Sequence, residues 1–111
     1  MTIYIVQGRY SQQGLKGLVD KPEDRGAEVK ALVERHGGRL LGYYVTLGEY
    51  DWMTISEGAD PVSLLGSLAV AGATGAFTDM KTTIAYTSAE AKQAFEMAHS
   101  ASGKFRAPGA A

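Results

Sequence analysis

The chain has 111 residues and a formal net charge of −1 at pH 7, so we expect one domain without the long-range field that attracts nucleic acid or an anionic membrane. It contains no cysteine, which excludes a disulfide framework, a thiolate nucleophile and a cysteine-ligated metal. Residues 1–6 carry neither a basic leader nor a long apolar run, which predicts no signal peptide, no membrane span and a cytoplasmic location.

The first half of the chain predicts a strand, two helical pieces and a second strand. Residues 2–10 are rich in Ile, Val and Tyr, as strands are. Residues 12–19 place their apolar side chains at helical spacing. The segment Asp20-Lys21-Pro22-Glu23 supplies a cap, a first-turn proline and a capping box for a second helix, which Gly37-Gly38 ends. A second strand follows over residues 39–47.

The second half predicts a third strand, a helix, a fourth strand and a terminal helix. The third strand covers residues 51–57, and Asp60-Pro61 is a typical helix start. Residues 77–86 read as the fourth strand, and Ser88 is expected to cap the last helix. We therefore expect a domain over residues 1–101 and a flexible tail over residues 102–111.

The predicted order is β-α-β-β-α-β followed by a helix, which is typical of an α+β, ferredoxin-like fold. Side chains alternate across a sheet, so each strand divides into two sets. We expect the aliphatic set, with Met53 and Ile55, to face the helices. The mixed set, with Trp52 and Tyr44, is then expected to face away and to be covered by a second copy of the sheet, as a homodimer or a higher homo-oligomer.

The turn Gly48-Glu49-Tyr50-Asp51 resembles the Gly-x-Tyr-Asp signature of the GYD-domain family, which belongs to the dimeric α+β barrel superfamily. The Arg9-Tyr10 strand end and the Gly37-Gly38 helix stop support the resemblance. It implies a homodimer whose two sheets pack face to face. The superfamily includes haem-degrading monooxygenases, muconolactone isomerases and ligand-sensing domains, so the resemblance does not choose between catalysis and binding.

The same turn carries the residues that suggest chemistry. If the protein is an enzyme, Asp51 or Glu49 is the expected base and Tyr50 a hydrogen-bond donor. The structural alternative is that Asp51 accepts turn hydrogen bonds while Tyr50 packs over the edge of the sheet.

A ligand pocket is expected between the sheet and the helices, near Tyr44, Asp51 and Trp52, with Arg9 as an anchor for an anionic group. Arg9 could equally pair with Asp51 or Glu49. The small residues between Gly66 and Gly75 leave room beneath their helix for a ligand.

The two histidines do not form a metal site by spacing. His36 is expected to interact with a helix C-terminus, and His99 to be solvated. The leading hypothesis is therefore a small-molecule-binding or catalytic protein without a metal cofactor. The alternatives are a non-catalytic structural or regulatory dimer and, last, a haem-binding monooxygenase-like protein. No nucleic-acid or membrane partner is expected.

Overall fold

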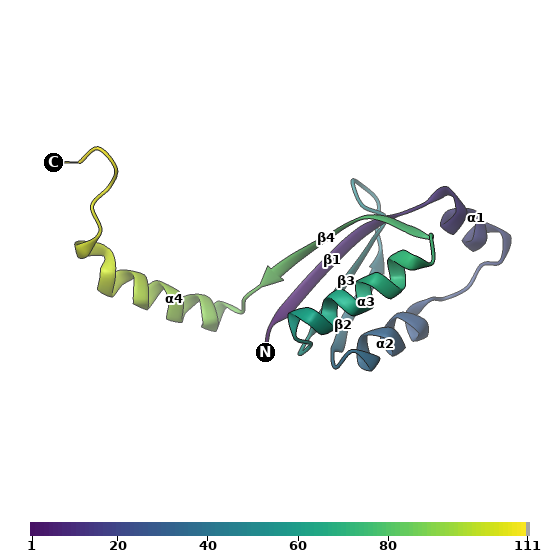
Figure 1. The fold of residues 1–111 in the computed structure, drawn as a ribbon, viewed down its shortest axis with the longest axis horizontal. Coiled ribbons are helices and arrows are strands. Elements are labelled where there is room, and N and C mark those ends of the chain that lie inside the picture. The colour runs from purple at the N-terminus through teal and green to yellow at the C-terminus, as the bar shows by residue number, and fades with distance from the viewer. Residues whose placement is uncertain (111) are drawn as a thin grey trace.

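The computed structural model describes residues 1–110, and Figure 1 shows an α+β chain with a helical arm at its C-terminal end. The elements are β1 (Ile3–Tyr10), α1 (Gln12–Asp20), α2 (Gly26–Arg35), β2 (Arg39–Val45), β3 (Trp52–Glu57), α3 (Pro61–Ala73), β4 (Phe77–Ala85), α4 (Ser88–Ala101) and the short 3-10 helix η1 (Ser102–Lys104).

The four strands of residues 1–110 form one antiparallel sheet in the order β2-β3-β1-β4. β3 therefore lies between β2 and β1, and β1 lies between β3 and β4. Each helical crossover thus connects two parallel strands that another strand separates, which is the split β-α-β arrangement of the ferredoxin-like fold. The predicted fold class and element order are confirmed.

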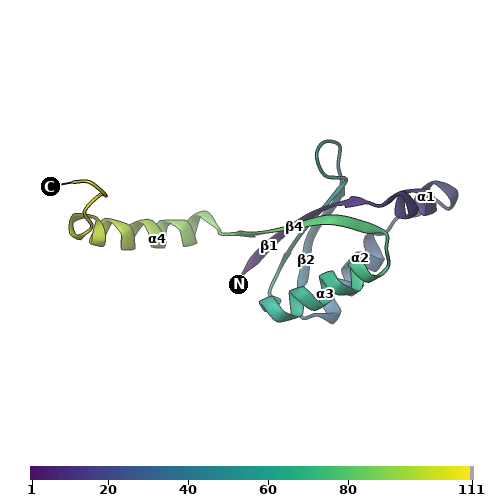
Figure 2. The same ribbon diagram turned by 45° about the horizontal axis from the view of Figure 1, so that its top comes forward.

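The helices are distributed unevenly around this sheet. α2 and α3 lie against one face, α1 lies beyond one end, and α4 projects away from the opposite end (Figures 1 and 2). We call the face under α2 and α3 the covered face and the other the uncovered face. The chain measures 64 × 30 × 22 Å, and the arm accounts for its elongation. Among the helices of residues 1–110, none has the length and apolar character needed to cross a bilayer.

Local hydrogen bonds and backbone preferences set the ends of the helices. Ser11 caps α1 and accepts a hydrogen bond from the Gly14 N–H, and Asp60 caps α3 by accepting one from the Ser63 N–H at 2.8 Å. Gly37 follows α2 with φ of +79°, in the left-handed region that glycine tolerates. The predicted start of α3 and end of α2 are confirmed.

The predicted start of the second helix is wrong. Asp20 is the last residue of α1, residues 21–25 form a connection, and α2 begins only at Gly26. Asp24, rather than Asp20, caps a backbone N–H there, accepting from Gly26 at 2.8 Å. The N-cap of α4 is likewise Thr87 and not Ser88, with Glu90 completing a capping box. The predicted tail, residues 102–111, begins with η1, and its last residue lies outside the described residues.

Candidate functional site

Alternate residues of the two central strands form the floor of the covered face. Tyr4 and Val6 of β1 are each 2% exposed, and their cross-strand partners in β3 are Ser56 and Thr54. Trp52 is 6% exposed and lies opposite Gly8. Residues directly opposite in an antiparallel pair share a face, so this strip runs under α2 and α3.

The orientation predicted for the third strand is wrong. Trp52, together with Thr54 and Ser56, faces the helices, whereas Met53 and Ile55 face away. Strand alternation separates the two sets but does not say which set meets the helices. An aliphatic face normally packs inside a protein, but here the aliphatic set of β3 lies on the uncovered face.

A glycine allows the indole of Trp52 to lie close to the sheet. A Cβ atom on Gly8 would lie 2.4 Å from Cζ2 and 2.8 Å from Cε2 of Trp52, which is closer than any van der Waals contact permits. The indole also contacts the edge of Phe77, with ring centroids 5.6 Å apart and planes at 76°. Both contacts fix the orientation of the ring.

A cavity of about 510 Å³ separates this floor from the helices. Its volume falls within the range of ordinary small-molecule sites, roughly 300–1,000 Å³. The sheet contributes Trp52, Thr54 and Ser56, α2 contributes Leu32, and α3 contributes Ser67 and further small or aliphatic side chains. The apolar part of the lining includes Val6, Leu18, Val29, Val33, Leu64, Leu68, Ala71 and Phe77. The expectation of room beneath residues 66–75 agrees with this cavity.

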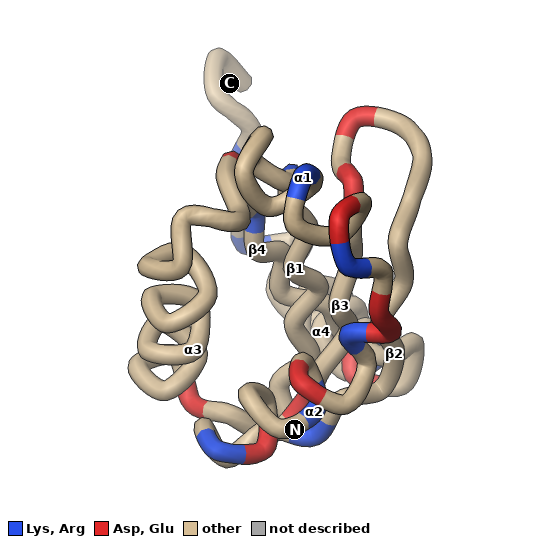
Figure 3. The backbone as a smooth tube through the Cα atoms, turned by 90° about the vertical axis from the view of Figure 1, so that its right-hand side faces the viewer, with Lys and Arg blue, Asp and Glu red and all other residues tan. Residues whose placement is uncertain are grey.

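Charge lies on one side of the cavity. Figure 3 shows α3 free of charged residues, whereas the connection before α2 and α2 itself carry both signs. The charged residues of the lining come from this second side: Lys21, Glu23, Arg25, Glu28 and Arg35. Arg25 is paired with Glu23 at 3.0 Å. The charges therefore form a rim, and the sheet strip of indole and hydroxyl groups forms an uncharged floor.

Two phenols lie at the α1 end of the cavity. Burial raises the pKa of the Tyr10 phenol far above its ordinary value of 10, and a hydrogen bond with Tyr43 and the nearby Asp51 carboxylate add to the rise. Tyr10 also packs on Phe77, with ring centroids 6.0 Å apart. The Tyr10 phenol is therefore neutral at physiological pH, and Tyr43 borders the cavity beside it. The sequence alone does not single out either phenol as a site residue.

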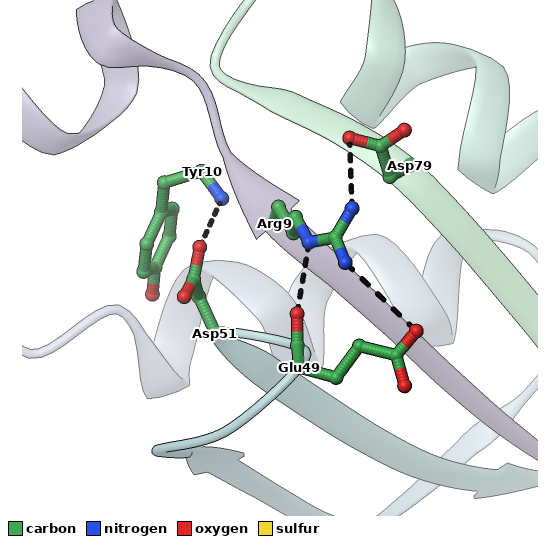
Figure 4. Close-up of polar contacts among 5 residues, drawn as sticks. All are labelled: Arg9, Tyr10, Glu49, Asp51 and Asp79. Atoms are coloured by element: carbon green, nitrogen blue, oxygen red, sulfur yellow. Dashed lines mark hydrogen bonds and ion pairs between the residues drawn. The ribbon is translucent and has the colours of Figure 1, made fainter.

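Arg9, Glu49 and Asp51 lie together at the end of the sheet (Figure 4). None of the predicted catalytic and anchoring residues lines the cavity. The Arg9 Nε–H donates to the backbone oxygen of Glu49 at 2.8 Å, and its guanidinium lies 3.9 Å from the Glu49 carboxylate and 3.6 Å from Asp79. It also lies 5.4 Å from the centroid of the Tyr50 ring. Arg9 is thus engaged in fastening the β2–β3 loop to β1 and β4.

Asp51 also connects that loop to β1. Its Oδ2 accepts a hydrogen bond from the Tyr10 N–H at 3.0 Å, and its own N–H donates to the Gly8 oxygen at 2.8 Å. Of the sequence-predicted site residues, all within the described part of the chain, Trp52 alone lines the cavity; Arg9, Tyr44, Glu49, Tyr50 and Asp51 do not. A catalytic role for Asp51, Glu49 and Tyr50 stays a prediction.

Asp79 was not selected from the sequence, and its backbone is unusual. The register of β1 and β4 shifts between Gln7 and Arg9, which inserts an extra residue on β4. Asp79 lies at this bulge with φ of +53°, a left-handed conformation that Asp tolerates better than most residues. The bulge turns its carboxylate toward Arg9. Nothing in a plain alternating strand signals such an insertion.

Tyr44 lies on the uncovered face, as expected, opposite Met53 and 57% exposed. The Nδ1 atom of His36 lies 2.9 Å from the Leu32 oxygen at the end of α2, in agreement with the expected structural role. Neither His36 nor His99 lines the cavity. Within residues 1–110, no three side chains of the His, Cys, Asp or Glu type are grouped closely enough to hold a metal ion.

Comparison with known proteins gives one match. The family model of the GYD domain matches residues 4–95, from β1 into the first half of α4. Searches of curated proteins and of solved structures found no match. The matched span includes all residues that line the cavity and all the sequence-predicted site residues, and it leaves out the end of the arm.

Proposed function

The chain belongs to the GYD domain family. We propose that it binds a small, largely apolar molecule between its sheet and its helices. The cavity of about 510 Å³ carries this proposal. Its lining combines aliphatic and aromatic side chains with a few hydroxyls, which is the usual composition of ligand pockets. Binding is favoured over catalysis because the candidate bases, Asp51 and Glu49, lie outside the cavity and are tied to β1.

The proposal is tested by titrating the protein with tetralin, an uncharged hydrocarbon of two fused rings. Trp52 is the sole tryptophan and lies in the cavity, so occupancy should change its fluorescence in a saturable way. A ligand that binds the folded state alone also raises the unfolding temperature. We expect both effects in the wild-type protein, and the absence of both would refute the proposal.

Two variants of α3 localise the site. Ala71 lines the cavity, whereas Ala69, on the same helix, is exposed and does not line it. Ala71→Phe should fill part of the cavity and weaken tetralin binding at least roughly tenfold, because a bulky ring occupies the ligand volume. Ala69→Phe should bind as the wild type does. Equal binding by all three proteins would place the ligand elsewhere.

A second proposal concerns self-association, and the uncovered face favours it. Ile3, Ile5, Met53 and Ile55 lie on that face with no helix of residues 1–110 over them. Ile5 lies directly opposite Ile55, and polar side chains such as Gln7, Glu57 and Lys81 border this aliphatic pair on the same face. A second copy with the same patch would cover it in the manner of a two-fold dimer. Sedimentation equilibrium measures the association directly, and a monomer at micromolar concentration would refute it.

The exposed arm supports the same proposal. Phe95 and Met97 of α4 are 71% and 73% exposed, and η1 is the one element within residues 1–110 that packs on α4 substantially. A structural or regulatory dimer with an empty cavity is the alternative to a ligand-binding dimer. The tetralin titration separates the two.

A further inference from the structure

A second hollow opens beside the cavity, between α1, the connection before α2 and the edge strand β2. This groove has a volume of about 410 Å³. Leu15 and Val45, two aliphatic residues of its lining, are 53% and 68% exposed. The complete apolar lining is Tyr10, Leu15, Leu18, Pro22, Tyr43 and Val45. Exposed apolar side chains gathered around a concave surface indicate a site where another surface packs.

The charged residues of the groove all come from the connection before α2. They are Glu23, Asp24 and Arg25, so the lining carries a net negative charge. Arg25 is neutralised by Glu23 at 3.0 Å. Asp24 accepts a hydrogen bond from the Gly26 N–H at 2.8 Å, but no cation pairs with it within residues 1–110. The groove is therefore apolar with an acidic border.

The end of the arm has the complementary chemistry. Phe105 is 80% exposed, and in the sequence it stands between Lys104 and Arg106. Neither cation forms an ion pair within residues 1–110. Residues 97–110 contain no Asp or Glu, so this end of the arm is basic. An aromatic ring between two cations matches an apolar groove with carboxylates at its border.

The two complementary parts lie at opposite ends of the chain. α4 projects from the end of β4, whereas α1 lies beyond the other end of the sheet (Figure 1). A two-fold dimer whose axis crosses the strands places each arm at the α1 end of the partner. α4 does not pack substantially on the domain, and Tyr86 and Thr87, which precede it, belong to no helix or strand. The direction of the arm is therefore not fixed by packing within its own chain.

These observations identify an occupant for the groove. We infer that Lys104, Phe105 and Arg106 of one chain dock into the groove of a second copy, with the ring among the apolar side chains and the cations facing Glu23 and Asp24. The inference rests on the self-association proposed above and names a contact that the uncovered face does not supply.

The chain contains no cysteine, so two introduced thiols can be cross-linked without interference. Val19→Cys places one thiol on α1, one turn beyond Leu15, and Ala107→Cys places the other just after the docking segment, so both surfaces stay intact. Val62→Cys is the matched control, because Val62 is exposed on α3 and lines neither hollow.

The variant chains are mixed in pairs with oxidised glutathione, and disulfide-linked heterodimers are followed by mass spectrometry. We expect the link between positions 19 and 107 to form at least roughly tenfold faster than that between positions 62 and 107, because docking raises the effective concentration of the first pair of thiols.

Two pairs of arm variants test the docking segment itself. Phe105→Ser should weaken self-association at least roughly tenfold in sedimentation equilibrium, as the loss of an aromatic anchor does. Phe95→Ser makes the same change at an exposed position of α4 and should associate as the wild type does. Lys104→Glu should weaken association about fivefold, and more than Lys92→Glu, which changes a lysine outside the segment.

Each result has one meaning. Equal cross-linking rates at positions 19 and 62 overturn the inference, and so does wild-type association by Phe105→Ser. In both cases the self-association proposal stands as long as the wild type still associates. A wild type that is monomeric at micromolar concentration refutes both. A chain carrying Val19→Cys and Ala107→Cys together that closes on itself at a rate independent of concentration would place the segment in its own groove and would also overturn the inference.

Discussion

The two faces of the sheet differ in a way that reverses the usual expectation. The covered face bears an indole, hydroxyls and phenols, and an open cavity lies between it and the helices. The uncovered face bears Ile3, Ile5, Met53 and Ile55, the kind of side chains that normally fill a core, beside polar residues such as Gln7 and Lys81. In an isolated chain these four apolar side chains have no helix over them.

The reversal makes sense if the two faces have different partners. A dry protein interface is best built from aliphatic side chains that pack without hydrogen bonds. A ligand site needs an apolar lining with a few polar groups that orient the bound molecule. The uncovered face suits the first purpose and the covered face the second. The following predictions test this division.

The largest expected effect comes from placing a charge on each face at neighbouring positions of β1. Val6 is 2% exposed, so Val6→Asp would bury an unpaired carboxylate and should cost at least about 3 kcal/mol of unfolding free energy. Ile5→Asp puts the same group on the uncovered face, where water can reach it in a monomer. Its monomer should stay folded, with a loss under about 1 kcal/mol.

Self-association should respond in the opposite way. In a face-to-face dimer Ile5→Asp brings like charges into an apolar interface and should weaken association on the order of 30-fold, the size of a hot-spot loss. Circular dichroism measures the folding of both variants, and sedimentation equilibrium measures their association. An Ile5→Asp protein that associates as strongly as the wild type would show that the uncovered face is not the interface.

The sequence predicted the frame of the fold better than the orientation of its strands. Asp60-Pro61 and Gly37-Gly38 act through local hydrogen bonds and backbone preferences, so their effects are readable from neighbouring residues. The side of β3 that carries Trp52 depends on where distant helices pack. Period-two alternation holds no information about that, and an apolar uncovered face removed the usual clue.

Competing local signals explain the other differences between the predicted and the observed structure. Asp20 has the chemistry of a helix cap, but it ends α1, where it pairs with Lys16 one turn earlier. The N-cap of α2 is Arg25, and Asp24 before it accepts a hydrogen bond from the Gly26 N–H. The candidate site was predictable in part: Trp52 and the small residues of α3 were found. The groove beside α1 was not, since its lining comes from residues far apart in the chain.

Adding one methyl group to each face gives the second prediction. Gly8→Ala pushes a Cβ atom into the Trp52 indole, which is 6% exposed and held by Phe77. We expect a loss of about 1–3 kcal/mol in denaturant unfolding, with a changed Trp52 emission maximum, because the ring must shift within a packed site.

Gly42→Ala is the matched change on the uncovered face. Its Cβ atom would meet the Tyr44 ring at 2.9 Å, but that side chain is 57% exposed and has room to rotate away. The variant should stay within about 0.5 kcal/mol of the wild type, aided by the smaller entropy of alanine in the unfolded chain. Equal losses for both variants would mean that the two faces are equally rigid.

The third prediction uses alkaline pH to weaken the covered face. The pKa of Tyr10 is raised in the folded state, mainly by burial, above the value of 10 expected in the unfolded chain. The contribution of Tyr10 to folding stability is therefore complete below pH 10 and declines as the pH rises beyond 10, because the phenol loses its proton at a lower pH in the unfolded chain than in the folded one.

The measurement is the unfolding free energy of the wild type minus that of Tyr10→Phe across this range. We expect the difference to be constant near neutral pH and to decline above pH 10. Other ionisations affect both proteins and cancel in the subtraction. A difference that stayed constant into strongly alkaline solution would contradict the raised pKa and the burial that causes it.

The smallest expected effect is acid destabilisation at the starts of two helices, α3 in the domain and α4 in the arm. Each start includes a carboxylate that accepts hydrogen bonds, Asp60 in α3 and Glu90 in α4. Hydrogen bonds from the Ser63 backbone and side chain lower the pKa of Asp60 below its ordinary 3.8, and those from Thr87 lower the pKa of Glu90 below 4.5. A lowered pKa stabilises the fold above the unfolded value, and the stabilisation disappears as the pH falls through the folded one. Both sets of hydrogen bonds should therefore weaken at acidic pH, but the measurable consequence should differ between the two helices.

α3 packs on the domain, so protonation of Asp60 should lower the temperature of the cooperative unfolding transition, and Asp60→Asn should remove that pH dependence. η1 is the one described element that packs substantially on α4, so protonation of Glu90 should reduce helix content in far-UV circular dichroism and leave the transition unchanged, while Glu90→Gln removes the response. If acidification lowered the unfolding temperature of the domain less in Glu90→Gln than in the wild type, the arm would have to pack on the domain or on a second copy strongly enough to share its unfolding.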